Sequence, residues 1–130
     1  MKENNIIIII DKPVKDVFEF TTNPKNTPFW IDSISEEVAE EYPPRIGTVY
    51  KNRSEGSVWS FYKVTEFKKD AVFMLSDLEG NYFVRYTYTP LDKNRTKMGY
   101  FEWVEKGELE KPFTHEILQK LKKVIEKKRE

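Results

Sequence analysis

Turn-forming residues recur about every ten positions through the middle of this chain, and that spacing limits the fold more than any other feature. Residues 43–44, 54–56, 68–70, 77–80 and 90–94 are rich in Pro, Gly, Asp and Lys. The runs between them are rich in aromatic and β-branched residues, which is typical of antiparallel strands joined by short turns. We therefore predict strands over 34–42, 47–53, 58–67, 71–75, 82–89 and 96–104.

The N-terminal segment predicts one further strand and a helix. Residues 6–10 are all isoleucine, and β-branched runs favour strands. Asp11 or Lys12 is expected at the cap of the next helix, with Pro13 in its first turn. Apolar spacing gives this helix one buried face, formed by Val14, Val17, Phe18 and Thr21. Residues 23–24, Asn-Pro, end it.

The last segment changes to a helical period. A stripe typical of an amphipathic helix is formed by Phe113, Ile117, Leu118, Leu121, Val124 and Ile125. Only the sheet offers a partner large enough for this stripe. We therefore predict an α+β fold in which an antiparallel sheet of six to seven strands packs on one long C-terminal helix. A length of 130 residues fits a single domain, spanning 1–130.

The loop after the first helix contains two large aromatics, Phe29 and Trp30, among helix breakers. One short helical turn is expected over residues 27–31. Loops normally run over the surface, so two large rings here need a reason. Two readings stay open: the rings line the mouth of a cavity, or they seal the core between the short helices and the sheet.

Composition excludes several classes of function. Cysteine is absent, which removes disulfides, thiolate metal sites and a cysteine nucleophile. Basic and acidic residues balance at 22 each, so no overall field attracts nucleic acid. The isoleucine run is too short to span a membrane. A cytoplasmic location agrees with the lack of thiols, and no cofactor is expected because no phosphate-binding glycine loop is present.

Two further features are most simply explained as ordinary surface residues of the C-terminal helix. His115 is the single histidine, and without a paired ligand or nucleophile we expect it to be an exposed helix residue rather than a metal or catalytic group. The basic residues 120–129 are expected to form the solvated side of the C-terminal helix. A charge-driven contact with a membrane surface or nucleic acid is the alternative.

The order and spacing of several short segments resemble the START-like (helix-grip, SRPBCC) superfamily, especially its small polyketide cyclase/dehydrase-like members. The segments are 8–14, 17–20, 23–24 with Trp30, 46–48, 62–67, 86–90 and Thr96. The resemblance implies a curved sheet that grips the C-terminal helix, with a cavity between them and Trp30 near its mouth. This superfamily includes lipid carriers, hormone receptors, cyclases and chaperone activators, so fold does not fix function. The short connection 105–111 leaves little room for a lid, and the many aromatics could fill the interior.

Alternation along the strands predicts which side chains face inward. On 82–89 one face is formed by Tyr82, Val84, Tyr86 and Tyr88, and on the next strand by Met98, Tyr100 and Glu102. If both faces point inward, the wall is rich in tyrosine and contains an acid. The alternative is that these are ordinary β-formers and that Glu102 reaches solvent.

On 58–67 the family likeness favours Tyr62 and Val64 facing inward. Simple alternation then puts Trp59, Phe61 and Phe67 on the outer face, although a β-bulge would switch the phase. Exposed aromatics on that face would form a patch for a protein partner or a homodimer. Mid-strand Gly99 is expected to mark a kink where the sheet curves.

Three functions from different classes are compatible with these patterns. The first is binding, without chemistry, of a small apolar or aromatic molecule by Trp30, Tyr62, Tyr86, Tyr88, Tyr100, Phe113, Ile117 and Leu121. The second is a cyclase or dehydratase with Tyr86 or Glu102 as acid or base. The third is an interaction module of the chaperone-activator type. An open cavity without an acid would favour ligand binding. An inward Glu102 with a raised pKa would favour the cyclase or dehydratase, and a filled interior would favour the interaction module.

Overall fold

The computed structural model describes residues 1–127 of the chain, and these form a seven-stranded antiparallel sheet with helices on one face. The strand order is β1-β7-β6-β5-β4-β3-β2. The elements are β1 (Glu3–Ile10), α1 (Val14–Thr22), the 3-10 helix η1 (Pro24–Phe29), β2 (Glu36–Ala39), β3 (Val49–Arg53), β4 (Ser60–Lys68), β5 (Val72–Asp77), β6 (Tyr82–Asp92), β7 (Arg95–Val104) and α2 (His115–Lys127).

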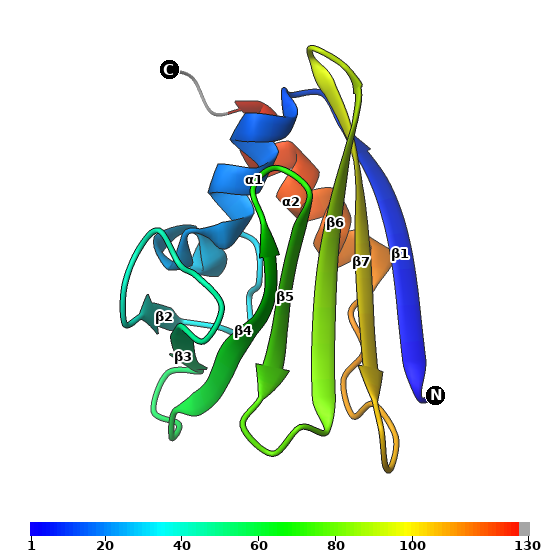
Figure 1. Ribbon diagram of the computed structural model, residues 1–130. Helices are drawn as coiled ribbons and strands as arrows, with labels where there is room; N and C mark the ends of the chain where they lie inside the picture. Colours follow the sequence, from blue (N-terminus) through cyan, green and yellow to red (C-terminus); the bar gives the residue numbers. More distant parts are fainter. Residues whose placement is uncertain (128–130) are drawn as a thin grey trace.

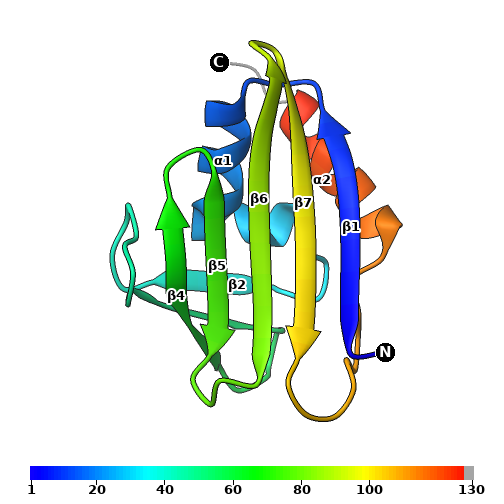
Figure 2. The same ribbon diagram turned by 45° about the vertical axis from the view of Figure 1, so that its right-hand side comes forward.

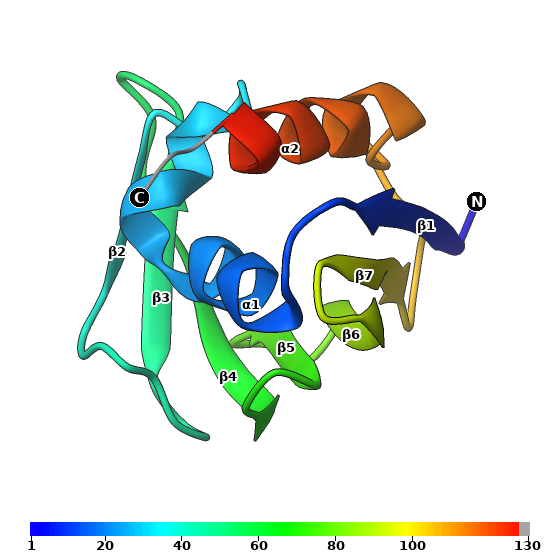
Figure 3. The same cartoon turned by 90° about the horizontal axis from the view of Figure 1, so that it is seen from above.

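The sheet curves around the helices, as the resemblance implies. Figure 1 shows α1 and α2 on one side of the strands. Seen from above, the strands pass around both helices from β2 on one side to β1 on the other (Figure 3). The predicted helix-grip α+β fold is confirmed, and all six strands predicted after the first helix are present. None of the helices within residues 1–127 is long and apolar enough to cross a membrane.

The core lies between the concave face of the sheet and the two α-helices. Alternation buries every second residue of the central strands, for example Val84, Tyr86 and Tyr88 of β6. These meet the apolar stripes of α1 and α2, of which Val17, Leu118 and Leu121 are completely buried. Full burial of such side chains stabilises a fold by about 1.5–3 kcal/mol each.

A β-bulge in β4 changes the phase of the strand. The pairing with β5 shifts between Val64 and Glu66. Before the shift, Val64 is buried and Phe61 is 45% exposed, so the inward and outward assignments of this pair are confirmed. After the shift, the ring of Phe67 lies 5.5 Å from Phe18 and 6.2 Å from Phe73. The expectation of an outward Phe67 is therefore wrong, because the extra residue turns it into the core.

The outer face of the sheet carries a ladder of stacked aromatic rings, but at a different place from the predicted one. Phe83 stacks on Trp103 at 5.0 Å and Phe101 stacks on Trp103 at 4.9 Å. This outer ladder (Phe83, Phe101 and Trp103) lies on β6 and β7, the strands that face the viewer in Figure 2. By contrast, the ring of Trp59 is covered by the cations of Lys51 and Arg53, at 4.5 and 4.3 Å.

Two predicted helix starts shift. Pro13 is the N-cap residue of α1, in place of Asp11 or Lys12, and the helix begins at Val14. The C-terminal helix begins at His115, so Phe113 lies before it. The backbone N–H of Phe113 donates to a carboxylate oxygen of Glu102 at 2.7 Å, which ties the segment before α2 to β7.

The basic side of α2 is partly paired with acids, one on α2 itself and two on neighbouring segments. Lys120 contacts Asp32, and Lys122 contacts Glu126 at 2.6 Å and Asp11 at 3.7 Å. Lys128 and Arg129, which the sequence also placed on this basic surface, lie outside the described residues.

Gly99 is required by close approach of neighbouring side chains. A Cβ at this position would lie 2.6 Å from Thr87 Oγ1 on β6. We predict that Gly99→Ala destabilises the fold by about 1–3 kcal/mol, as overpacking does elsewhere, because the β-branched Thr87 has little rotamer freedom. Urea denaturation measures the loss. The double variant Gly99→Ala/Thr87→Ala should recover most of it, and equal losses with and without Thr87 would contradict this explanation.

Candidate functional site

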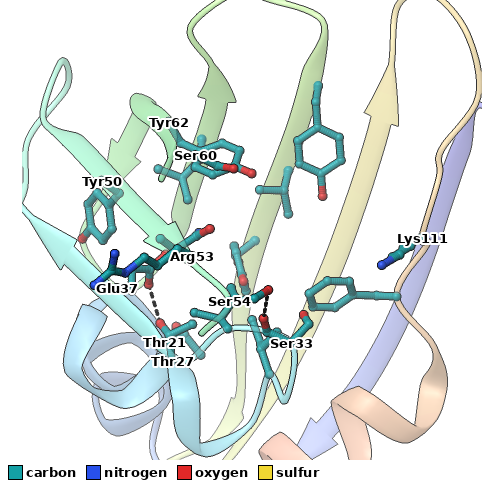
Figure 4. A pocket seen from close by; sticks show the side chains of 18 of the residues that line it. Thr21, Thr27, Ser33, Glu37, Tyr50, Arg53, Ser54, Ser60, Tyr62 and Lys111 are labelled. Carbon is teal, nitrogen blue, oxygen red and sulfur yellow. Dashed lines mark hydrogen bonds between the residues drawn. The ribbon is translucent and has the colours of Figure 1, made fainter. Parts of the chain in front are cut away.

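A cavity of about 340 Å³ lies between the concave face of the sheet and the segments that follow η1. This volume falls within the range of small-molecule pockets, about 300–1,000 Å³, so the interior is not filled by its aromatics. Figure 4 shows the side chains that surround it. Seven aromatic side chains contribute to its wall: Tyr50, Tyr62, Phe73, Tyr82, Tyr86, Tyr100 and Phe113.

These rings pack against one another and form a preorganised wall. Phe113 stacks on Tyr100 at 4.5 Å, and Tyr100 meets Tyr86 edge-on at 5.3 Å. The chain of contacts continues through Phe73 to Tyr50, at 5.8 and 5.6 Å. Edge-to-face and offset-stacked pairs are the favoured arrangements of aromatic rings. The wall is therefore held in place before any ligand enters.

Four of the eight predicted site residues line this cavity and four do not. Tyr62, Tyr86, Tyr100 and Phe113 line it. Leu121 is completely buried in the core, and Ile117 packs partly buried against the core. The hydroxyl of Tyr88 lies 2.7 Å from Thr21 Oγ1. These residues pack the gap between sheet and helix tightly, which moves the cavity away from α2.

Trp30 seals the core instead of lining the cavity mouth. Its side chain is 2% exposed, and its ring meets Phe113 edge-on at 6.0 Å. Phe29, its neighbour in the loop, is 59% exposed. Trp30 thus lies behind the cavity wall and supports Phe113 from the core side. Of the two readings of this loop, the sealing role is the one that the structure bears out for Trp30.

Glu102 is buried among phenols, as one reading of the alternation predicts, but it does not line the cavity. Its side chain is 2% exposed, so the expectation that it reaches solvent is wrong. One carboxylate oxygen accepts hydrogen bonds from Tyr82 at 2.6 Å and Tyr100 at 3.5 Å. The other accepts from Asn4 Nδ2 at 2.9 Å and from the backbone of Phe113 at 2.7 Å. Four donors occupy this carboxylate, which ties together β1, β6, β7 and the segment before α2.

Glu37 is a second inward carboxyl, and it does line the cavity. Thr27 donates to one of its oxygens at 2.5 Å, and Asn52 Nδ2 donates to the other at 3.1 Å. Burial raises the pKa of Glu37, and these two hydrogen bonds offset the rise only in part. This residue was missed because Glu36 and Glu37 are adjacent on a short strand, and alternation alone does not say which faces inward.

Burial also raises the pKa of the tyrosines in the wall. The pKa of Tyr86 lies well above its ordinary value, and that of Tyr62 is raised as well. The charge of Glu37 adds to both shifts. These phenols therefore stay protonated around neutral pH and can donate hydrogen bonds inside the cavity.

The mouth of the cavity is polar. Ser54 Oγ donates to the backbone oxygen of Ser33 at 2.7 Å, and Val58 beside them is 87% exposed. Lys111 lines the side opposite Glu37 (Figure 4).

His115 is exposed and contacts Gln119 at 2.9 Å, and it is not one of the lining residues. No cluster of three or more His, Asp or Glu side chains in the described part of the chain could hold a metal ion.

We predict that Glu102→Ala costs roughly 2–4 kcal/mol of unfolding free energy, because it leaves several buried donors without an acceptor. The matched control is Glu66→Ala, which removes a partly exposed pair with Arg85 at 3.0 Å and should cost about 1 kcal/mol or less. Urea denaturation of both variants gives the two losses. Similar losses would mean that Glu102 does not hold the strands and the Phe113 segment together.

Comparisons with known proteins identify the fold and no closer relationship. No protein-family model matches the sequence, and no curated protein matches it. A START superfamily protein from Mycobacterium smegmatis superimposes with a TM-score of 0.74, 13% identity, and coverage of 97% of this chain and 98% of that one. The Aha1 dimer structure from Colwellia psychrerythraea gives 0.70, 15% identity, and 98% coverage of both chains. The Zhui aromatase/cyclase from Streptomyces sp. R1128 gives 0.63, 14% identity, and coverage of 96% and 84%. The chain has the START-like helix-grip fold.

Proposed function

We propose that this protein binds a small, largely apolar, ring-containing molecule in the cavity between the sheet and the segments that follow η1. The observation that carries the proposal is an open cavity of about 340 Å³ whose wall contains seven aromatic side chains. Sites for small molecules are usually preformed, mostly apolar and equipped with a few polar groups. The tyrosines supply both the apolar rings and polar tips, and Glu37 supplies a further polar group.

Binding without chemistry is favoured over catalysis by either of the expected acid–base residues. Glu102 does not line the cavity, and four donors already occupy its carboxylate. The pKa of Tyr86 is raised by burial, so its phenol is a poor base near neutral pH. A cyclase or dehydratase acting on a polyketide-like substrate is the second candidate. It is favoured by Glu37, a carboxyl with a raised pKa inside the cavity.

Titration with the apolar fluorophore N-phenyl-1-naphthylamine tests ligand binding. We expect saturable binding of one molecule per chain, with fluorescence rising as the dye leaves water. Val84→Trp places a large ring in the cavity and should weaken binding at least tenfold, about 1.4 kcal/mol. Thr89→Trp adds the same ring at an exposed position of the same strand and should leave binding unchanged.

A melting curve for each variant controls for folding, and Leu75→Phe offers a milder filling of the same cavity. Unsaturable binding in the unaltered protein would contradict the proposal. So would equal affinities in folded Val84→Trp and Thr89→Trp.

The outer sheet face supports a further proposal, a contact with another protein such as a second copy of this chain. The outer ladder on β6 and β7 is only partly buried, and Ile7 and Ile9 on the neighbouring strand β1 are 54% and 44% exposed. Contiguous exposed apolar surface commonly marks an interaction site. The Aha1 structure of the same fold is that of a dimer.

Sedimentation equilibrium tests self-association through this face. If the face joins two copies, the mass should approach that of a dimer as concentration rises, and Ile7→Lys/Trp103→Lys should shift it to the monomer. A monomeric mass at all concentrations, or a dimer that persists in the folded double variant, would exclude this surface as a homodimer interface.

A further inference from the structure

Glu37 is a carboxyl without a cationic partner. Its two hydrogen bonds come from neutral groups, Thr27 and Asn52. Within residues 1–127 it forms no ion pair with a Lys, Arg or His side chain. Carboxylates removed from water are normally paired with a cation or neutralised by a proton. A cavity-facing carboxyl of this kind leaves room for a cation brought by the ligand.

The guanidinium of Arg53, which lines the cavity, is already engaged elsewhere. It donates to Glu36 at 3.0 Å and lies 4.3 Å from the centre of the Trp59 ring. Glu36 is the exposed neighbour of Glu37 on β2. The two adjacent acids therefore have different roles: Glu36 holds Arg53 at the surface, and Glu37 faces inward without a charge partner.

Aromatic rings surround Glu37 on the cavity side. Tyr50, Tyr62 and Tyr86 line the same cavity as Glu37. Burial raises the pKa of each of these tyrosines, and the charge of Glu37 adds to the rise. The hydroxyl of Tyr50 donates to the backbone oxygen of Thr22 at 2.7 Å and is not directed at Glu37. Ring faces beside a carboxylate form a setting that attracts an alkylammonium group, through cation–π contacts and a charge-assisted hydrogen bond.

We propose that the ligand is an arylalkylamine, whose protonated amine binds Glu37 and whose aromatic body packs among the tyrosine and phenylalanine rings of the cavity. The proposal rests on the function proposed above and names the ligand class for the same cavity. Two cationic side chains also line the cavity: Lys111 lies on the side opposite Glu37 (Figure 4), and the guanidinium of Arg53 is paired with Glu36.

The proposal predicts that ligand affinity depends on pH. Around Glu37 the facing groups are Thr27 of η1, Tyr50, Asn52 and Arg53 of β3, Tyr62 of β4 and Tyr86 of β6. The raised pKa values keep these phenols protonated, and burial raises the pKa of Glu37, so the Glu37 carboxyl is the group among them whose titration we expect to be coupled to binding. An ammonium stabilises the ionised carboxylate and lowers its pKa. Binding below the pKa of free Glu37 therefore releases a proton, and affinity rises with pH by up to about tenfold per unit until that pKa is passed.

Isothermal titration calorimetry from pH 5 to 8 with three matched probes tests this inference. The probes are 2-(2-naphthyl)ethylamine, the neutral 2-(2-naphthyl)ethanol and the anionic 2-naphthylacetate. We expect the amine to bind at least tenfold more tightly than the alcohol at pH 8 and to release up to one proton per molecule at pH 5, measured in buffers of different ionisation enthalpy. Glu37→Gln should bring the amine to the affinity of the alcohol and abolish the proton release, with the alcohol unaffected.

A second readout checks the carboxyl itself. Because the folded pKa of Glu37 is raised, ionising it in the cavity costs stability above its unfolded pKa. The melting temperature of Glu37→Gln should therefore exceed that of the unaltered protein at pH 8 and approach it at pH 5. Adding the amine should narrow this difference at pH 8.

The remaining outcomes would contradict the amine proposal, the binding function, or both. Equal affinities for amine and alcohol, or a preference for naphthylacetate, would overturn the amine proposal while leaving the binding function standing. Amine affinity that is unchanged in Glu37→Gln would overturn it too. A failure of all three probes and of the fluorophore to bind would remove the proposed function together with this inference.

Discussion

The hydrogen bonds of the buried Glu102 carboxylate connect the sheet to the segment that closes the cavity. By accepting from the backbone of Phe113, this carboxylate fixes the segment between β7 and α2 at a point two residues before the helix begins. The ring of Phe113 is then free to stack on Tyr100, and Trp30 packs against it from behind. The same carboxylate accepts from Asn4 of β1 and Tyr82 of β6. One buried acid thus links three strands, the segment before α2 and one wall of the cavity.

The two inward carboxyls differ in how well they are satisfied. Glu102 has four donors and is 2% exposed, which suits a group that holds structure together. Glu37 has two neutral donors and borders the cavity. A carboxylate that has spare acceptor capacity and forms no ion pair within residues 1–127 is available to a ligand. This contrast is why the proposed recognition centres on Glu37.

Much of the fold was predictable from sequence because its signals are local. Turn residues mark the hairpins, β-branched and aromatic runs mark the strands, and the spacing of Leu118, Leu121 and Ile125 marks α2. Strand alternation also placed Tyr86, Tyr100 and Glu102 correctly on the inner face.

The errors arise where long-range contacts decide. One extra residue in β4 turns Phe67 inward, and a carboxylate on β7 binds the backbone of Phe113 in the segment before α2. Trp30 and Leu121 are buried in the core by long-range packing that no local pattern reveals. Glu37 was overlooked because its neighbour carries the same side chain and only the pairing of β2 with β3 sets which one faces inward.

The concave side of the sheet, and not its outer face, is the proposed binding surface for the small ligand. Two-dimensional NMR with a naphthalene-based ligand tests it most directly, by mapping shift changes residue by residue. We expect changes concentrated at Glu37, Tyr62, Leu75 and Tyr86, with little change at the outer ladder. Changes concentrated at Phe83, Phe101 and Trp103, or none at saturating ligand, would contradict it.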